Sequence, residues 1–163
     1  MTPRADDAPP RAERPLLSLV VFLAATALAA VVGGVAASGA QETYAALALP
    51  PFAPPAWLFG PAWSVLYVLI ALAGWLVWRR AGWGLPIALW ILQLVLNAAW
   101  TPLFFGGGLY GWALAEILVL WLVVLLCVWV FRAWRPVAAL LLLPYAAWVA
   151  YAAALNLGIV VLN

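Results

Sequence analysis

Residues 16–38 read LLSLVVFLAATALAAVVGGVAAS, an apolar run without a charged residue. A helix of about 20 apolar residues spans the hydrocarbon core of a bilayer, so this run predicts a transmembrane helix. The alternative is a signal peptide cleaved near Ser38, Gly39 and Ala40, because a signal peptidase accepts small residues. The run is longer than the apolar region of about 7–15 residues in a signal peptide, which favours a helix that is retained.

Four further apolar segments follow, separated by turn-forming or charged residues. Residues 39–56 contain Pro50, Pro51, Pro54 and Pro55. Proline lacks a backbone donor and restricts the residue before it, so we expect a long, stiff loop there. Pro102 should loosen the last turn of its span. The expected spans are residues 16–38, 57–78, 86–105, 109–131 and 137–162.

The composition supports a membrane protein. Hydrophobic residues make up 70% of the chain and charged residues 7%, against about 25% charged residues in soluble domains. One aqueous core cannot hide so much apolar surface in a chain of this size. The predicted fold class is therefore all-α, an integral membrane bundle of five transmembrane helices over residues 16–163, with the lipid bilayer as its main partner.

All seven basic residues are arginines, and five spans would place every one of them on the same side. They lie in residues 1–15, after the second span and after the fourth. Cytoplasmic connections retain positive charge, so the N-terminus is expected in the cytoplasm, with a bacterial cytoplasmic membrane as the host. Residues 1–15 combine prolines and charges with little apolar content, which predicts a disordered cytoplasmic tail.

Several function classes are excluded by what the chain lacks. It has no histidine and a single cysteine, Cys127, so an internal disulfide, a zinc site and histidine acid–base catalysis are excluded. A net charge of +2 without a basic patch argues against nucleic acid as a partner. No metal, cofactor or catalytic residue is predicted, and enzymatic activity is left open but not favoured.

Polar and aromatic residues recur on one face of three predicted spans. The third span carries Gln93, Asn97, Trp100 and Phe104, the fifth carries Tyr145, Trp148, Ala152 and Asn156, and the second carries Trp63 and Tyr67. Offsets of three and four residues place each set on one helix face. Amides avoid lipid, so these faces should meet around one cavity in the bundle. The alternative is that they only join helices to one another.

Two other patterns leave their roles open. Glu116 is the only acid inside a span, where it could couple proton movement or form a structural hydrogen bond near the interface. Small residues repeat every four positions in the first and fifth spans, at Ala25, Ala29, Gly33 and Ala37 and at Ala146, Ala150, Ala154 and Gly158. Such faces allow close helix packing, either within the bundle or across a dimer.

Several strings resemble those of one membrane protein family. Residues 49–57 read LPPFAPPAW and residues 60–67 read GPAWSVLY, residues 97–105 read NAAWTPLFF, and residues 144–148 read PYAAW before Asn156. In order and spacing, this resembles the tryptophan-rich sensory protein / peripheral-type benzodiazepine receptor family, also called the translocator protein family. Leu49 and Phe52 depart from the family pattern in the first loop.

The resemblance implies a bundle of five helices, commonly dimeric, with a pocket beneath the first loop for a porphyrin. Matching positions imply these ligand-binding residues: Tyr44, Trp63, Asn97, Trp100, Tyr145, Trp148, Ala152 and Asn156. Tyr67 is added to this set because it lies one helical turn from Trp63. The implied function is a membrane tetrapyrrole-binding sensory or translocator protein that modulates porphyrin or stress signalling. The alternatives are light-dependent porphyrin breakdown, for which Trp63 and Trp148 match, and a small proton-coupled exporter centred on Glu116.

Overall fold

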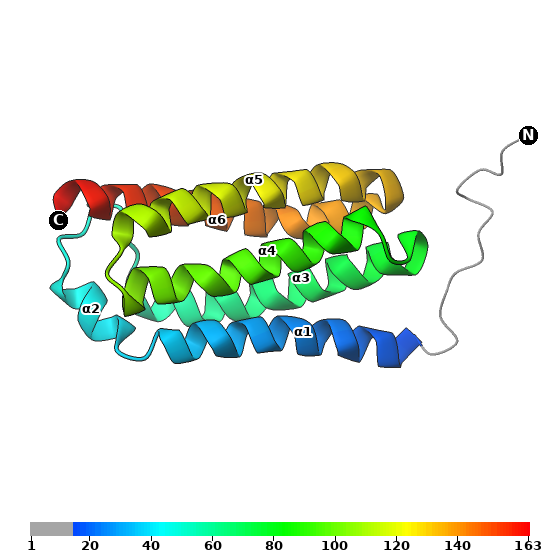
Figure 1. Ribbon diagram of the computed structural model, residues 1–163, viewed down its shortest axis with the longest axis horizontal. Helices are drawn as coiled ribbons and strands as arrows, with labels where there is room; N and C mark the ends of the chain where they lie inside the picture. The colour runs from blue at the N-terminus through cyan, green and yellow to red at the C-terminus, as the bar shows by residue number, and fades with distance from the viewer. Residues whose placement is uncertain (1–14) are drawn as a thin grey trace, which may run out of the picture.

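The computed structural model describes residues 15–163, and every regular element in that range is helical (Figure 1). Within the described residues, five helices are long and apolar enough to cross a bilayer, so the predicted all-α bundle of five transmembrane helices is confirmed. The predicted tail lies outside the described residues, apart from Pro15 at the start of α1. The elements are α1 (Pro15–Ala36), α2 (Ala40–Ala46), η2 (Ala56–Leu58), α3 (Phe59–Ala81), α4 (Leu85–Thr101), η3 (Pro102–Gly106), α5 (Tyr110–Trp134) and α6 (Pro136–Leu162).

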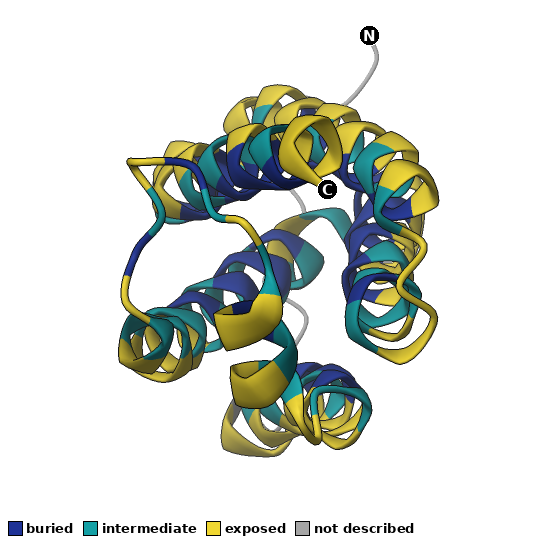
Figure 2. Cartoon of the chain, turned by 90° about the vertical axis from the view of Figure 1, so that its left-hand side faces the viewer, coloured by how far each residue is buried: buried dark blue, intermediate teal, exposed yellow. Residues whose placement is uncertain are grey.

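The long helices form a closed ring whose order differs from their order in the chain. Helix α1 packs against both α3 and α4, α3 packs against α6, and α5 lies between α6 and α4. Figure 2 looks along the bundle and shows the buried faces of the helices turned toward one another. The three helices that carry the predicted polar faces, α3, α4 and α6, therefore belong to one enclosed interior.

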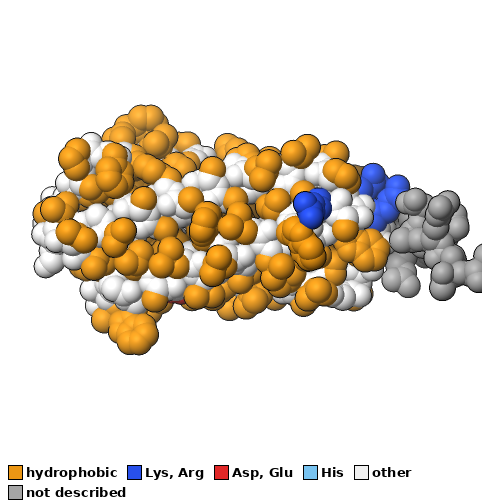
Figure 3. Space-filling model, turned by 90° about the horizontal axis from the view of Figure 1, so that it is seen from above, with side chains coloured by type: hydrophobic (Ala, Val, Ile, Leu, Met, Phe, Trp, Pro, Cys, Tyr) orange, Lys and Arg blue, Asp and Glu red, His pale blue; other side chains and the backbone are white. Residues whose placement is uncertain are grey.

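The outer surface of the bundle is apolar. Large hydrophobic side chains such as Leu16 and Val161 are 77% and 74% exposed, and hydrophobic side chains cover most of the face seen in Figure 3. A soluble monomer rarely exposes so large a continuous apolar surface. Acyl chains of a bilayer would cover this surface, which agrees with the lengths of the helices.

The connector after α1 differs from its prediction. Residues 39–56 were expected to form a loop, but they begin with the short helix α2, Ala40–Ala46. Its sequence, AQETYAA, contains no proline or glycine, so nothing prevents helix formation before Pro50. The prediction of a loop over the whole connector was wrong because it extended the effect of the prolines to residues that precede them.

The ends of α4 and α5 also differ from their predicted bounds, by one turn or less. The α-helix α4 ends at Thr101, and a π-helical turn, η3, continues to Gly106. Pro102 has no N–H to donate to the preceding turn, which explains the change of helix type there. Helix α5 continues past residue 131 to Trp134, because Arg132 suits the negative end of a helix and Pro136 begins the next one.

Candidate ligand-binding site

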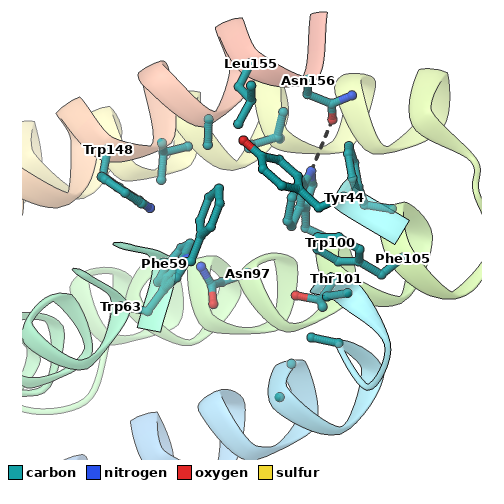
Figure 4. A pocket seen from close by; sticks show the side chains of 18 of the residues that line it. Tyr44, Phe59, Trp63, Asn97, Trp100, Thr101, Phe105, Trp148, Leu155 and Asn156 are labelled. Atoms are coloured by element: carbon teal, nitrogen blue, oxygen red, sulfur yellow. Dashed lines mark hydrogen bonds between the residues drawn. The ribbon is translucent and has the colours of Figure 1, made fainter. Parts of the chain in front are cut away.

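A cavity of about 300 Å³ lies inside one half of the bundle, beneath α2 (Figure 4). Ligand pockets in proteins range from about 300 to 1,000 Å³, so this cavity is at the lower end. Its walls come from α1, α3, α4, η3, α5 and α6, and α2 and η2 close it at one end. Its polar and aromatic lining residues are Gln41, Tyr44, Phe59, Trp63, Tyr67, Asn97, Trp100, Thr101, Phe104, Phe105, Trp148 and Asn156.

Eight aromatic side chains line the cavity. Trp100 stacks on Phe104 with ring centroids 4.9 Å apart, and Phe59 meets Trp148 edge to face at 6.1 Å. Stacked and edge-to-face pairs are the favoured arrangements of aromatic rings. These contacts fix the ring orientations, so the cavity offers preformed flat surfaces to a ligand.

A polar network joins three helices at the side of the cavity. The Tyr67 hydroxyl donates a hydrogen bond to Oδ1 of Asn97 at 2.7 Å. The Asn97 amide in turn donates through Nδ2 to the Tyr145 hydroxyl at 3.2 Å. Asn97 is only 5% exposed, and buried amides need such partners. The network orients Asn97 between α3 and α6.

A second amide joins α6 to α4 and α5. Asn156 accepts a hydrogen bond from the Trp100 indole N–H at 3.3 Å (dashed line in Figure 4). Its Nδ2 donates to the carbonyl oxygen of Tyr110 at 3.0 Å. This pair of bonds holds the Trp100 ring against the cavity, so Asn156 acts on the site through the orientation of Trp100.

The indole of Trp148 has an unused donor. Its Nε1 is buried and has no hydrogen-bond partner, and Figure 4 shows this nitrogen pointing toward the middle of the cavity. A buried donor without a partner costs free energy, about 1–3 kcal/mol. An acceptor on a bound ligand would remove that cost, so Trp148 offers both a flat surface and one polar contact.

Residues 40–58 form a roof segment over the cavity. One tyrosine forms a hydrogen bond within this segment, and another joins the segment to α6. The Tyr44 hydroxyl donates to the carbonyl oxygen of Pro54 at 3.0 Å, and the Tyr151 hydroxyl of α6 donates to the carbonyl oxygen of Phe52 at 2.8 Å. Burial, and to a lesser extent the charge of Tyr151, raises the pKa of Tyr44 above its ordinary value. Tyr44 therefore remains a neutral donor at neutral pH.

The end of α6 also holds the roof segment. Asn163 accepts from the N–H of Ala48 and donates to its carbonyl oxygen, both at 3.1 Å. Gly158 lies so close to Pro50 that a Cβ at this position would come within 2.9 Å of the proline ring. Glycine in the predicted small-residue face of this helix thus allows contact with the roof segment.

Comparison with known proteins identifies the family. The sequence model of the TspO/MBR family matches residues 20–162, nearly the whole of the chain. The chain belongs to the TspO/MBR family. It is therefore a TspO-type integral membrane protein that crosses the bilayer several times.

Individual TspO/MBR relatives are similar over most of their length. The translocator protein of Ovis aries is 40% identical over 118 residues, covering 69% of this chain and 70% of that protein. The tryptophan-rich protein TspO of Archaeoglobus fulgidus is 41% identical over 131 residues, covering 78% and 84%. The tryptophan-rich sensory protein of Cereibacter sphaeroides is 37% identical over 144 residues, covering 88% and 90%.

The predicted site residues of this TspO/MBR protein do not all reach the cavity. Tyr145 is fully buried and contacts the edge of Trp63 at 6.2 Å, so it supports the wall from behind. Gln93 shares the face of Asn97 but is bonded to the carbonyl oxygen of Trp90 at 3.0 Å, away from the cavity. The lining includes Tyr44, Trp63, Tyr67, Asn97, Trp100, Trp148, Ala152 and Asn156.

The wall formed by α1 was missed by the sequence analysis. Ala30, Gly33, Gly34 and Ala37 line the cavity, and a Cβ on Gly34 would meet no atom within 4 Å. Small residues carry no functional group, so only the adjacent pair Gly33 and Gly34 hinted at this wall. In this TspO/MBR protein, part of the small-residue face of α1 creates space inside the bundle.

Glu116 lies outside the cavity of this TspO/MBR protein. It borders a shallow groove with Leu103, Trp112 and Val119 between η3 and α5. Both of its carboxyl oxygens are buried without a hydrogen-bond partner. Its location separates Glu116 from the aromatic wall, so any role it has does not require contact with a ligand in the cavity.

Proposed function

We propose that the cavity binds a tetrapyrrole, a metal-free porphyrin in particular, and that the protein senses or translocates it. The observation that carries this proposal is the wall of ordered aromatic rings around Trp148. A flat apolar macrocycle gains free energy by stacking on such rings. The relatives' names speak of translocation and of sensing, and we extend them to porphyrin or stress signalling here.

The polar groups of the cavity suit the edge of such a ligand. The Trp148 N–H is unpaired, so it is available to a carboxylate or ring acceptor on the macrocycle. The amides of Asn97 and Asn156 are already bonded to protein groups, which makes them positioning residues. The chain has no histidine to ligate iron, which favours the metal-free ring over haem.

Protoporphyrin quenching of tryptophan fluorescence tests this proposal on the full-length purified protein. Wild type should quench saturably, and Trp148→Ala should weaken the affinity about tenfold through lost stacking and one lost polar contact. Trp148→Phe should fall between them, because it keeps the flat ring and removes the donor. Trp112→Phe is the matched control, because Trp112 is 72% exposed on the outer surface.

Two results would remove the proposed site. One is an affinity of Trp148→Ala equal to that of wild type, and the other is an equal loss in Trp112→Phe. The second result would mean that porphyrin partitions onto the lipid-facing surface. A competition with unlabelled lipid vesicles separates that partitioning from binding in the cavity.

Light-dependent porphyrin breakdown is the second candidate, because both tryptophans that match it, Trp63 and Trp148, line the cavity. Illumination of the bound complex should bleach the porphyrin absorbance. The double variant Trp63→Phe and Trp148→Phe should bind more weakly, and at saturating porphyrin it should bleach more slowly. Equal bleaching at equal occupancy would exclude a role of these two tryptophans in the breakdown, and no bleaching in wild type would rule out the activity; both results leave the binding proposal intact.

A further inference from the structure

The described arginines all lie at one end of the bundle. Arg79 and Arg80 end α3, Arg132 is in the last turn of α5, and Arg135 joins α5 to α6. Helix α6 packs against both α3 and α5, which brings these ends together. Figure 3 shows the arginine side chains gathered at this end, opposite the roof segment.

The positive charge of this end is uncompensated within residues 15–163. The acids in that range are Glu42, in α2, and Glu116, near the start of α5, so both lie in the half of the bundle that contains the cavity. Four guanidinium groups without a neighbouring carboxylate attract anions. Arginine presents planar donors that match a phosphate in bidentate geometry.

Two arginine side chains at this end contact indole rings, and two have a buried Nε. The guanidinium carbon of Arg79 lies 4.9 Å from the ring centroid of Trp75, and that of Arg132 lies 5.6 Å from Trp129. Nε of Arg79 and Nε of Arg135 are both buried without a hydrogen-bond partner. Each is a donor of a charged group that still lacks an acceptor, which is costly away from water.

The surface beside the arginines is apolar and faces the bilayer. Trp129 is 60% exposed and Leu140 is 62% exposed, so both α5 and α6 expose large apolar side chains near the arginines. Trp83 and Trp134 are also exposed at this end, as is typical of residues at the membrane interface. A ligand that satisfies both regions has an anionic head and apolar chains.

We propose that the arginine end of the bundle is a binding site for an anionic phospholipid. The phosphate of the headgroup would accept hydrogen bonds from Arg79 and Arg135, and Arg132 would add charge. The acyl chains would lie along the exposed faces of α5 and α6. This site is separate from the cavity and does not depend on what the cavity binds.

Native mass spectrometry of the full-length protein in detergent tests the proposal. Dioleoyl phosphatidylglycerol should bind with higher occupancy than dioleoyl phosphatidylcholine. Each surface arginine favours an anionic lipid by about fivefold, so Arg79→Gln with Arg135→Gln should lower the phosphatidylglycerol affinity about 25-fold. Equal occupancy of the two lipids in wild type, or an unchanged affinity in the double variant, would overturn the site.

Two further double variants distinguish specific hydrogen bonds from a general attraction by positive charge, and a loss of binding from a loss of folding. Arg79→Lys with Arg135→Lys keeps the charge and loses the planar donors, so its preference for phosphatidylglycerol should also fall. A preference equal to that of wild type would mean that positive charge alone explains lipid binding, and it would overturn the assigned hydrogen bonds. Arg80→Gln with Arg132→Gln alters only exposed side chains, and it should weaken binding while the thermal midpoint without lipid stays constant.

Two other groups could occupy the arginines, namely a soluble anion and the carboxylates of residues 1–14, and further measurements test both. Glycerol phosphate and inorganic phosphate, added without lipid, should not raise the thermal midpoint as phosphatidylglycerol does. An equal rise would mean that the site binds a soluble anion. Residues 1–14 contain Asp6, Asp7 and Glu13, so the triple variant Asp6→Asn, Asp7→Asn and Glu13→Gln is also needed. If only this variant binds phosphatidylglycerol, the carboxylates of the chain itself occupy the arginines and the proposal fails.

Discussion

The Tyr67 hydroxyl donates a hydrogen bond of 2.7 Å to Oδ1 of Asn97, which joins α3 to α4 beside the cavity. This bond satisfies the acceptor of an amide that is only 5% exposed. The same amide donates to Tyr145 of α6. One side chain of α4 therefore links α3 to α6 beside the cavity.

Tyr67→Phe tests this bond. It keeps the ring and removes the hydroxyl, which leaves Oδ1 of Asn97 buried without a donor. We expect the variant to lose about 1–2 kcal/mol of stability and to lower the thermal midpoint. Tyr151→Phe is the control, because that hydroxyl bonds to Phe52 at an exposed site. An equal midpoint for Tyr67→Phe and wild type would show that the bond contributes nothing.

Gly74 allows α3 to approach α4. A Cβ at this position would overlap the indole ring of Trp90, whose N–H is bonded to the carbonyl oxygen of Ile70 at 2.9 Å. Gly74→Ala should therefore displace the ring and cost about 1–3 kcal/mol of stability. Gly60→Ala, in the same helix and with no atom within 4 Å, should be neutral in the same thermal unfolding measurement. Similar midpoints for the two variants would contradict this packing.

Ala152→Leu should fill part of the cavity. Ala152 is on the cavity wall, and a leucine side chain would project into space that a ligand needs. We expect at least a tenfold loss of protoporphyrin affinity with little change in the thermal midpoint, measured by fluorescence quenching. Ala154→Leu is the matched control, because Ala154 is exposed on the same helix. Unchanged affinity in Ala152→Leu would place the ligand elsewhere.

The stability of the protein should fall in alkaline solution partly because of Tyr44. Its pKa is raised in the folded state from an ordinary value of 10.0, mainly by burial. Above that pH the unfolded chain releases the proton more readily than the folded chain, so the free energy of unfolding decreases. Thermal midpoints measured from about pH 8 to pH 11 should fall less steeply for Tyr44→Phe than for wild type. Parallel curves would contradict this role for the hydroxyl.

Glu116→Gln separates the exporter hypothesis from the binding site. Glu116 does not line the cavity, so porphyrin affinity should not change. An ionised carboxylate without a partner is costly in a membrane span, so the neutral amide should leave the thermal midpoint equal or higher. Proton-coupled export would require substrate flux in proteoliposomes to collapse in this variant. A loss of porphyrin binding would instead show that Glu116 supports the cavity.

The sequence predicted three of the cavity walls because amides and rings are distinctive against an apolar background. Asn97 and Trp100 on one helix and Trp148 and Asn156 on another follow the helical period, so their faces could be identified. The period alone did not show how wide each face is. Tyr145 is three residues before Trp148, and this rotation turns it toward Asn97 and away from the open space.

The remaining parts of the site depend on residues that carry no chemical signal. The wall of α1 is made by Gly33, Gly34 and alanines, which are abundant throughout this chain. The short helix α2 was hidden by the prolines that follow it, although it places Gln41 and Tyr44 over the cavity. The position of the roof segment results from contacts between distant residues, which one sequence does not reveal.

The bond between Asn163 and Ala48 joins residues 115 positions apart, and this separation determines when the site can be completed. A chain is synthesised from its N-terminus, so α1 to α5 leave the ribosome before α6 does. Until α6 has left the ribosome, the contacts of Tyr151, Gly158 and Asn163 with the roof segment are absent. A ligand in the cavity is therefore held beneath an anchored roof segment only after α6 has been synthesised, and a nascent chain that stalls in α6 would lack these contacts.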